Sequence, residues 1–201
     1  EEGFVFCCFN QIYKITPSVL DSWVRIFKQV KDSLFIIFSD NEVVERNLTA
    51  EFLKRGFDHK RIIFTAKLDR PSYMARYRVV DLFLDTSPCN AGTTASDALK
   101  MGVPLITLKG KSFNSREAAS ILNSINLPEL ITSTPEEYES LAIELATNPE
   151  KLNAIKAKLN DNLSTAPLYD TKLFTKNLES AYTQMYDRHH QGEEPEHIYV
   201  E

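Results

Sequence analysis

Small polar residues gather in one stretch of the sequence, LDTSPCNAGTTASDAL at residues 84–99. Within it, Gly92, Thr93 and Thr94 follow an apolar run and come directly before an amphipathic segment. A helix that begins there would present unpaired N–H groups and a partial positive charge, which suit a phosphate. Gly92 would let a ligand approach the backbone, and the two hydroxyls would add donors. Asp97, about one turn further on, would accept hydrogen bonds from a sugar hydroxyl such as that of a ribose.

The same residues also admit a purely structural interpretation. Thr93 would then cap the helix, and Asp97 would only interact favourably with the positive end of the helix. The residues alone leave both interpretations open. The six glycines of the chain form neither a GxGxxG nor a Walker pattern, which disfavours a dinucleotide site and a P-loop.

A second polar cluster lies in FNQIYKI, residues 9–15, where Asn10 and Gln11 follow an apolar run and Lys14 comes three residues later. Ligands of open parallel sheets bind at the carboxyl ends of the strands. If this run is a central strand, its loop faces the same edge as residues 92–94. Lys14 would then neutralise a diphosphate without a metal ion. A solvated loop lysine is the alternative.

Short apolar runs that alternate with amphipathic segments must position these clusters. The runs predict six strands: Phe4–Phe9, Leu34–Phe38, Arg61–Thr65, Asp81–Asp85, Pro104–Leu108 and, at the edge, Glu129–Thr132. The segments between them carry helix signals at both ends: Thr16-Pro17 and Thr134-Pro135 at N-termini, Gly56 and Gly102 at C-termini. The alternation predicts an α/β fold, a Rossmann-like parallel sheet with helices on both faces.

Two further helices are expected where the pattern is weaker, from Pro71 to about Arg78 and near Asn114–Leu122. After the sixth strand, helices begin at Thr134, Asn148 and Asp170, and we expect the terminal ones to pack across the sheet or to reach a neighbouring lobe. Residues 1–190 thus form one lobe, with 170–190 as its terminal helix, and residues 191–201 form a polar tail that is loosely held.

Composition narrows the function. The 201 residues are 43% hydrophobic and 25% charged, as in a globular domain, and the net charge of −5 argues against nucleic acid as a partner. No apolar run approaches the ~20 residues that span a bilayer, so no membrane partner is expected. The cysteines Cys7, Cys8 and Cys89 lack metal-ligand spacing, which favours reduced, partly buried thiols and a cytoplasmic location. The chain starts at Glu1 without a methionine, and we interpret it as a piece of a longer protein.

At these residues the sequence resembles the C-terminal catalytic lobe of the O-GlcNAc transferases, glycosyltransferases that carry tetratricopeptide repeats. The segments that carry the resemblance, in order, are FNQIYKITPS, RIIFT, LDTSPCNAGTTASDAL, MGVPLITL and SREAAS. Similarity continues into EEYESLAIELATNPEKL and LESAYTQMY, so that it covers almost the whole chain. Each motif is weak alone, but five in sequence are specific.

The resemblance implies a GT-B enzyme, in which a nucleotide sugar lies between two Rossmann-like lobes and the C-terminal lobe holds most of the donor. It implies inverting transfer of N-acetylglucosamine from UDP-GlcNAc to Ser or Thr hydroxyls of proteins, with no metal and no cofactor. The partners would be a nucleotide sugar and a protein or peptide acceptor. The acceptor would bind through the N-terminal lobe and the repeats, which are absent from this chain.

The resemblance also implies roles for individual residues. Lys14 would be the catalytic residue that offsets charge on the departing UDP, and Gln11 would touch the diphosphate. Thr93 and Thr94 would clamp the phosphates, and Asp97 would take the ribose hydroxyls. The remaining expected donor contacts are Asn10, Ala66, Leu68, Arg70, Tyr73, Arg76 and Gly92, among which the backbone near Ala66–Leu68 would read the uracil edge.

The chain departs from the family at two positions. Tyr73 stands where the animal enzymes carry a histidine that stacks on uracil, and Gly92 stands where they carry a histidine before the two threonines. Gly92 therefore leaves another donor, UDP-glucose or GDP-fucose, as an alternative, whereas Gln11 favours UDP-GlcNAc. A Rossmann-like interaction module without catalytic activity is a further alternative.

The family's candidate catalytic histidines belong to the N-terminal half. The histidines of this chain, His59, His189, His190 and His197, lie before a strand or in the polar C-terminal region and are expected to face solvent. The catalytic base is therefore expected outside the 201 residues. We expect the isolated chain to fold and to bind UDP weakly, but to transfer no sugar.

Overall fold

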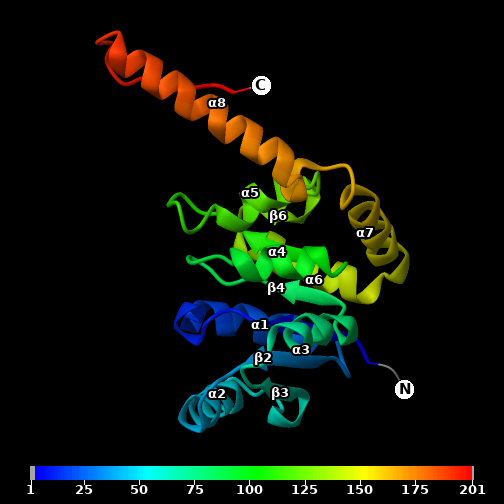
Figure 1. The fold of residues 1–201 in the computed structure, drawn as a ribbon. Coiled ribbons are helices and arrows are strands. Elements are labelled where there is room, and N and C mark those ends of the chain that lie inside the picture. The colour runs from blue at the N-terminus through cyan, green and yellow to red at the C-terminus, as the bar shows by residue number, and fades with distance from the viewer. Residues whose placement is uncertain (1–2, 201) are drawn as a thin grey trace.

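The computed structural model describes residues 3–200, in which six parallel strands form one sheet (Figure 1). The strands are β1 (Val5–Cys8), β2 (Leu34–Phe38), β3 (Ile62–Thr65), β4 (Leu82–Leu84), β5 (Leu105–Leu108) and β6 (Ile131–Thr132). Their order across the sheet is β3-β2-β1-β4-β5-β6. The predicted α/β architecture is confirmed, with β1 in a central position and β6 at an edge. The loops after β1 and β4 therefore leave the sheet side by side.

Most strands are shorter than the apolar runs suggest. β2 has the predicted bounds, while β1 and β4 each lose a residue at both ends. β6 loses two residues at its start: it begins at Ile131 rather than Glu129 because Pro128–Leu130 forms a 3₁₀ turn. Phe9 and Leu130 are buried although they lie just outside β1 and β6, so an apolar residue next to a strand can be mistaken for part of it.

Residues 3–200 contain eight α-helices, most of which connect or cover the strands. They are α1 (Pro17–Gln29), α2 (Glu42–Lys54), α3 (Arg70–Ala75), α4 (Thr93–Lys100), α5 (Glu117–Ser124), α6 (Pro135–Thr147), α7 (Pro149–Asn162) and α8 (Thr171–His190). Several predicted helix ends are confirmed. Thr16 accepts a hydrogen bond from the Val19 N–H at the start of α1, and Gly56 and Gly102 adopt φ of 71° and 78° after α2 and α4.

Two predicted helices have different bounds. The helix expected over 71–78 ends at Ala75 and tightens into a 3₁₀ turn over Arg76–Val79. The helix expected from Asn114 begins only at Glu117, since Ser112 and Ser115 form a local turn. In that turn the Ser115 N–H and hydroxyl both donate to the Ser112 carbonyl, at 3.2 and 2.9 Å. Side-chain bonds of this kind compete with helix formation.

Right-handed crossovers decide which face each helix covers. The chain moves from β1 to β2 in one direction and from β4 to β5 in the other, so α1 and α4 lie on opposite faces of the sheet. On the sheet face that α1 covers, the ring centroids of Trp23 and Phe27 lie 5.0 and 4.9 Å, respectively, from that of Phe35. All three rings are fully buried and form the centre of the core on that face.

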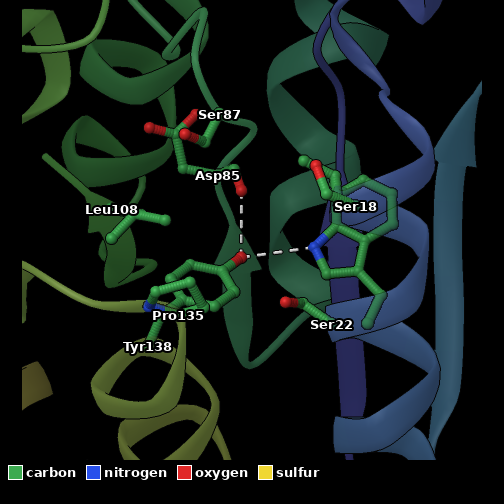
Figure 2. A pocket seen from close by; sticks show the side chains of 9 residues that line it. Ser18, Ser22, Asp85, Ser87, Leu108, Pro135 and Tyr138 are labelled. Carbon is green, nitrogen blue, oxygen red and sulfur yellow. Dashed lines mark hydrogen bonds between the residues drawn. The ribbon is translucent and has the colours of Figure 1, made fainter. Parts of the chain in front are cut away.

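Helix α6 packs beside α1, and its Tyr138 binds the main chain at Asp85, directly after β4. The Tyr138 hydroxyl donates to the Asp85 carbonyl at 2.9 Å and accepts from Trp23 Nε1 at 3.2 Å, as the dashed lines in Figure 2 show. These groups line a small cavity of about 80 Å³. The Asp85 main chain is therefore held by two helices on the face opposite α4.

The start of α6 gives a test of local stability. Thr134 accepts a hydrogen bond from the Glu137 N–H at 3.1 Å, while the Glu137 carboxylate accepts one from the Ser133 N–H at 2.8 Å. The predicted helix start at Thr134 thus forms a capping box whose second bond is displaced by one residue. We expect Thr134→Ala to lower the free energy of unfolding by about 1 kcal/mol, measured by urea denaturation. The exposed Ser140→Ala of the same helix is the control, and an equal loss in both variants would contradict the capping role.

The two last helices behave differently. α7 contacts α6 and buries Leu152, Ile155 and Leu159, so it packs against the lobe. α8 has no buried residue and extends away from the rest of the lobe, as Figure 1 shows in orange and red. α8 therefore does not pack across the sheet, so that expectation is wrong for this helix. The other expectation, that it reaches a neighbouring lobe, stays a prediction.

Two smaller expectations can be compared with the structure. Cys7 and Cys8 are buried, Cys89 is half-buried, and all three thiols are free; burial raises the pKa of Cys7 and Cys8. None of the helices within residues 3–200 combines the length and the apolar character that crossing a membrane requires.

Candidate functional site

The loops after β1 and β4 meet at the carboxyl edge of the sheet, as the sequence predicts. Lys14 lies in a 3₁₀ turn (Ile12–Lys14) after β1, and its Nζ donates to the carbonyl oxygen of Asn90 at 2.7 Å. Seventy-six positions separate the two residues in the chain. The ammonium group is half-buried and adjoins the loop that leads into α4. Lys14 is thus not a solvated loop lysine.

Asn10, one of the expected donor contacts, lies inside the protein rather than at its surface. Its side chain is 1% exposed, and its Nδ2 donates to Thr86 Oγ1 at 2.8 Å and to Asp85 Oδ1 at 3.1 Å. Its Oδ1 accepts from the Thr94 hydroxyl at 2.5 Å. Because the whole amide is used inside the protein, Asn10 orients Thr94 rather than presenting a free group at the surface.

The Asp85 carboxylate is the centre of this network, and the sequence reasoning did not select it. Its Oδ1 accepts from the backbone N–H groups of Ala91 at 2.7 Å and Thr86 at 2.8 Å, and its Oδ2 accepts from Thr107 Oγ1 at 2.7 Å. Burial raises the pKa of Asp85 to about 6, although these hydrogen bonds oppose the shift. An acidic residue at the end of a fully apolar strand was the signal available in the sequence.

No side chain is hydrogen-bonded to the N-terminus of α4 as a cap. Gly92 is the N-cap residue, and no side chain caps the helix, so Thr93 does not have the purely structural role considered above. The first bond within the helix runs from the Ser96 N–H to the Gly92 carbonyl. The N–H groups of residues 93–95 therefore lack partners within the helix, as at any helix start. Thr93 is exposed and Thr94 is half-buried.

A hollow of about 410 Å³ lies beside Thr94. It is lined by residues that follow β1, β2, β3 and β4 in the chain or lie at their ends: Phe9, Gln11, Phe38, Asp40, Lys67, Leu68, Arg70, Tyr73, Arg76 and Thr94. Six of these were predicted donor contacts, namely Gln11, Leu68, Arg70, Tyr73, Arg76 and Thr94. Ala66 does not line the hollow, although its neighbour Lys67 does.

Aromatic rings and a guanidinium group form one wall of the hollow. The Arg76 guanidinium carbon lies 3.7 Å from the centroid of the Phe9 ring and 4.2 Å from that of Tyr73. The Tyr73 hydroxyl lies 3.2 Å from that of Tyr77, and burial raises the pKa of Tyr73, which keeps it neutral. The Tyr73 ring and the Arg76 guanidinium are groups on which a planar aromatic ligand can stack.

The carboxylate of Asp97 is already engaged. Arg70 donates to it twice, from Nη1 to Oδ2 at 2.8 Å and from Nη2 to Oδ1 at 2.6 Å. Asp97 is buried whereas Arg70 is largely exposed. Each carboxylate oxygen retains acceptor capacity beyond one bond, so a hydroxyl can join this pair without displacing the guanidinium.

The four histidines lie outside any such arrangement. All four, His59, His189, His190 and His197, are exposed, as the sequence predicts. The site is thus formed by Lys14, the α4 N-terminus and the adjoining hollow, with Asn10 and Asp85 beneath them.

Comparison with known proteins agrees with this geometry. The model of glycosyl transferase family 41 matches residues 1–178. A probable UDP-N-acetylglucosamine–peptide N-acetylglucosaminyltransferase SEC of Arabidopsis thaliana is 35% identical over 201 residues, which are 100% of this chain and 21% of that protein. The UDP-N-acetylglucosamine–peptide N-acetylglucosaminyltransferase of Caenorhabditis elegans is 34% identical over 198 residues, 98% of this chain and 17% of its own length. The chain therefore spans about a fifth of these relatives.

Solved structures show the same lobe. The O-GlcNAc transferase of Thermobaculum terrenum superposes with a TM-score of 0.88 at 31% identity, over 92% of this chain and 36% of the other. An Anabaena protein solved with UDP and glucose has a TM-score of 0.65 at 16% identity, over 89% of this chain and 49% of its own, which speaks for the fold alone. The predicted GT-B lobe is thereby confirmed. Since the family model covers most of the chain and the relatives match along its whole length, the chain belongs to glycosyl transferase family 41.

Proposed function

We propose that this chain is the donor-binding lobe of an inverting, metal-independent glycosyltransferase that moves N-acetylglucosamine from UDP-GlcNAc to Ser or Thr hydroxyls of proteins. Membership of family 41 supports the class of reaction, and the names of the relatives support the donor and the peptide acceptor. The proposal includes no cofactor. A cytoplasmic location agrees with the three free thiols.

One observation carries the proposal: the Lys14 ammonium lies against the Asn90 carbonyl, two residues before the open N-terminus of α4. A cation and a row of N–H groups from two different loops thus converge on the space where a diphosphate would lie. Lys14 has further N–H donors beyond the one used on Asn90. This arrangement meets the need of a diphosphate without a metal ion.

The same groups explain how transfer would be accelerated. A departing nucleoside diphosphate gains negative charge as the bond from its phosphate oxygen to the sugar carbon breaks. Lys14 and the N–H groups of Thr93 and Thr94 are fixed in place before the reaction and would stabilise that charge in the transition state. The acceptor hydroxyl forms the new bond at the sugar carbon and loses its proton to a base, which we place outside the 201 residues.

The hollow beside Thr94 would hold the nucleoside. Tyr73 and Arg76 in its wall would stack on the uracil ring, and the backbone near Ala66–Leu68 would read the edge of the base. Asp97, oriented by Arg70, would accept the ribose hydroxyls.

Ligand binding to the purified chain tests the proposal. We expect UDP at 100 times its dissociation constant to stabilise the chain by about 2.7 kcal/mol, which corresponds to a rise in Tm of roughly 5–10 °C for a domain of this size. UDP-GlcNAc, UDP-glucose and GDP-fucose are compared in the same thermal-shift assay. A larger shift with GDP-fucose would transfer the proposal to that donor. No shift with any nucleotide would favour the interaction module.

A further inference from the structure

Glu117 lies at the site although nothing above assigns it a role. It is the first residue of α5, which follows β5, and its carboxylate occupies the space where Gly92 has no side chain. A Cβ built on Gly92 would come within 2.7 Å of Glu117 Cδ and nearer still to Oε1, closer than real contacts allow. Glycine at position 92 therefore makes room for this carboxylate beside the N-terminus of α4.

The carboxylate is uncommitted there. Within residues 3–200, no hydrogen bond or ion pair engages Glu117, whereas the carboxylates of Asp97 and Asp85 nearby already have partners. Glu117 is half-buried and also lines an open hollow of about 550 Å³ together with Lys109, Phe113 and Arg116. A ligand at Gly92 can thus reach both carboxylate oxygens.

The order of the strands indicates which part of a donor would meet Glu117. The hollow beside Thr94, which would hold the base, is lined mainly by residues at the carboxyl ends of β1 and β2 and after β1, β2 and β3. The proposed diphosphate position lies between the loops after β1 and β4. The next strand in the sheet is β5, and Glu117 follows it. A nucleotide sugar that runs along this edge, base first, brings its sugar ring to the β5 side of the phosphates.

Charge and chemistry agree with that placement. A carboxylate next to a phosphate is repelled, but a carboxylate next to a sugar accepts hydrogen bonds from neighbouring hydroxyls through its two oxygens. We propose that Glu117 accepts hydrogen bonds from hydroxyl groups of the donor's sugar ring and is thereby a specificity-determining residue. This inference rests on the proposed function, because it requires the diphosphate to lie at the α4 N-terminus.

The test compares dissociation constants of UDP and UDP-GlcNAc for the 201-residue chain by isothermal titration calorimetry. Loss of the Glu117 charge changes the interaction with the phosphates equally in UDP and UDP-GlcNAc. The ratio of the two dissociation constants therefore reports only the contribution of the sugar. The measured quantity is the dissociation constant of UDP-GlcNAc divided by that of UDP. We expect this ratio to be about tenfold higher in Glu117→Gln than in the wild type, because a hydrogen bond to a charged group is lost. Glu150→Gln, in the first turn of α7, is the matched control and should leave the ratio unchanged.

A second arm uses Gly92. Gly92→Ala should displace the carboxylate and raise the same ratio, and its cost in Tm should shrink in a Glu117→Ala background, where the added methyl group has room. Folding of each variant is checked by circular dichroism. If the wild type binds UDP but Glu117→Gln leaves the ratio unchanged, the role of Glu117 is overturned and the proposed function stands. If the wild type binds neither ligand, both are overturned.

Discussion

Replacement of Lys14 by alanine is expected to lower the rate of sugar transfer by about 100- to 1,000-fold, the usual loss when one preorganised donor to a developing negative charge is removed. The ammonium is held at 2.7 Å from the Asn90 carbonyl, so that its position is set before any ligand arrives. Because this chain spans about a fifth of its relatives, initial rates are measured on the longer protein that also contains the acceptor-binding segments.

The matched control is Lys28→Ala. Lys28 also donates from Nζ to a backbone carbonyl, that of Arg55 at 2.9 Å, but it lies at the far end of α1. We expect this variant to retain the wild-type rate and the Lys14 variant to keep its fold, as judged by Tm. Full activity of Lys14→Ala would remove the group on which the proposed function depends.

Asp85 should make stability depend on pH in the sense opposite to most carboxylates. Its folded pKa of about 6 lies above the ordinary value of 3.8, so the native state holds the proton more tightly than the unfolded state. The associated stabilisation is complete below pH 3.8 and is lost as pH rises through about 6. The loss between about pH 4 and about pH 7 is on the order of 2 kcal/mol.

Asp85→Asn removes this titration while it preserves the shape of the side chain. Its amide nitrogen can donate to Thr107 Oγ1, as the protonated carboxyl would. The difference in free energy of unfolding, wild type minus Asp85→Asn, should therefore fall between about pH 4 and about pH 7 in urea denaturation. The same substitution at an exposed position, Asp161→Asn, serves for comparison. If the difference for the Asp85→Asn variant stays constant or rises with pH, Asp85 titrates normally and the expectation is wrong.

Local signals in the sequence were sufficient for the elements of the fold. Prolines and threonines at helix starts and glycines at helix ends act within one turn, and apolar alternation is a property of neighbouring residues. The adjacency of Lys14 and the Gly92 loop also followed, because it depends only on β1 being central and on the rule for ligand sites in parallel sheets.

Pairings across the chain were beyond such reasoning. Arg70 and Asp97 are 27 positions apart, and Asn10 and Asp85 are 75 apart. Both pairs turn expected ligand contacts into groups that already have partners. Glu117 was overlooked for the same reason: the space left by Gly92 becomes meaningful only when α5 is placed beside α4. Side-chain contacts between distant elements depend on tertiary packing, which periodicity does not record.

The division of the edge among separate βα connections has an evolutionary consequence. Apart from Thr94, the residues that line the hollow beside Thr94 lie at the ends of β1 and β2 or in the connections after β1, β2 and β3. Glu117 belongs to the connection after β5, and Asp85 anchors the loop after β4 to the core. A substitution in the connection after β5 therefore leaves the residues that line the hollow beside Thr94 unchanged. A lineage could thus exchange its preferred carbohydrate while it inherits nucleotide recognition unchanged.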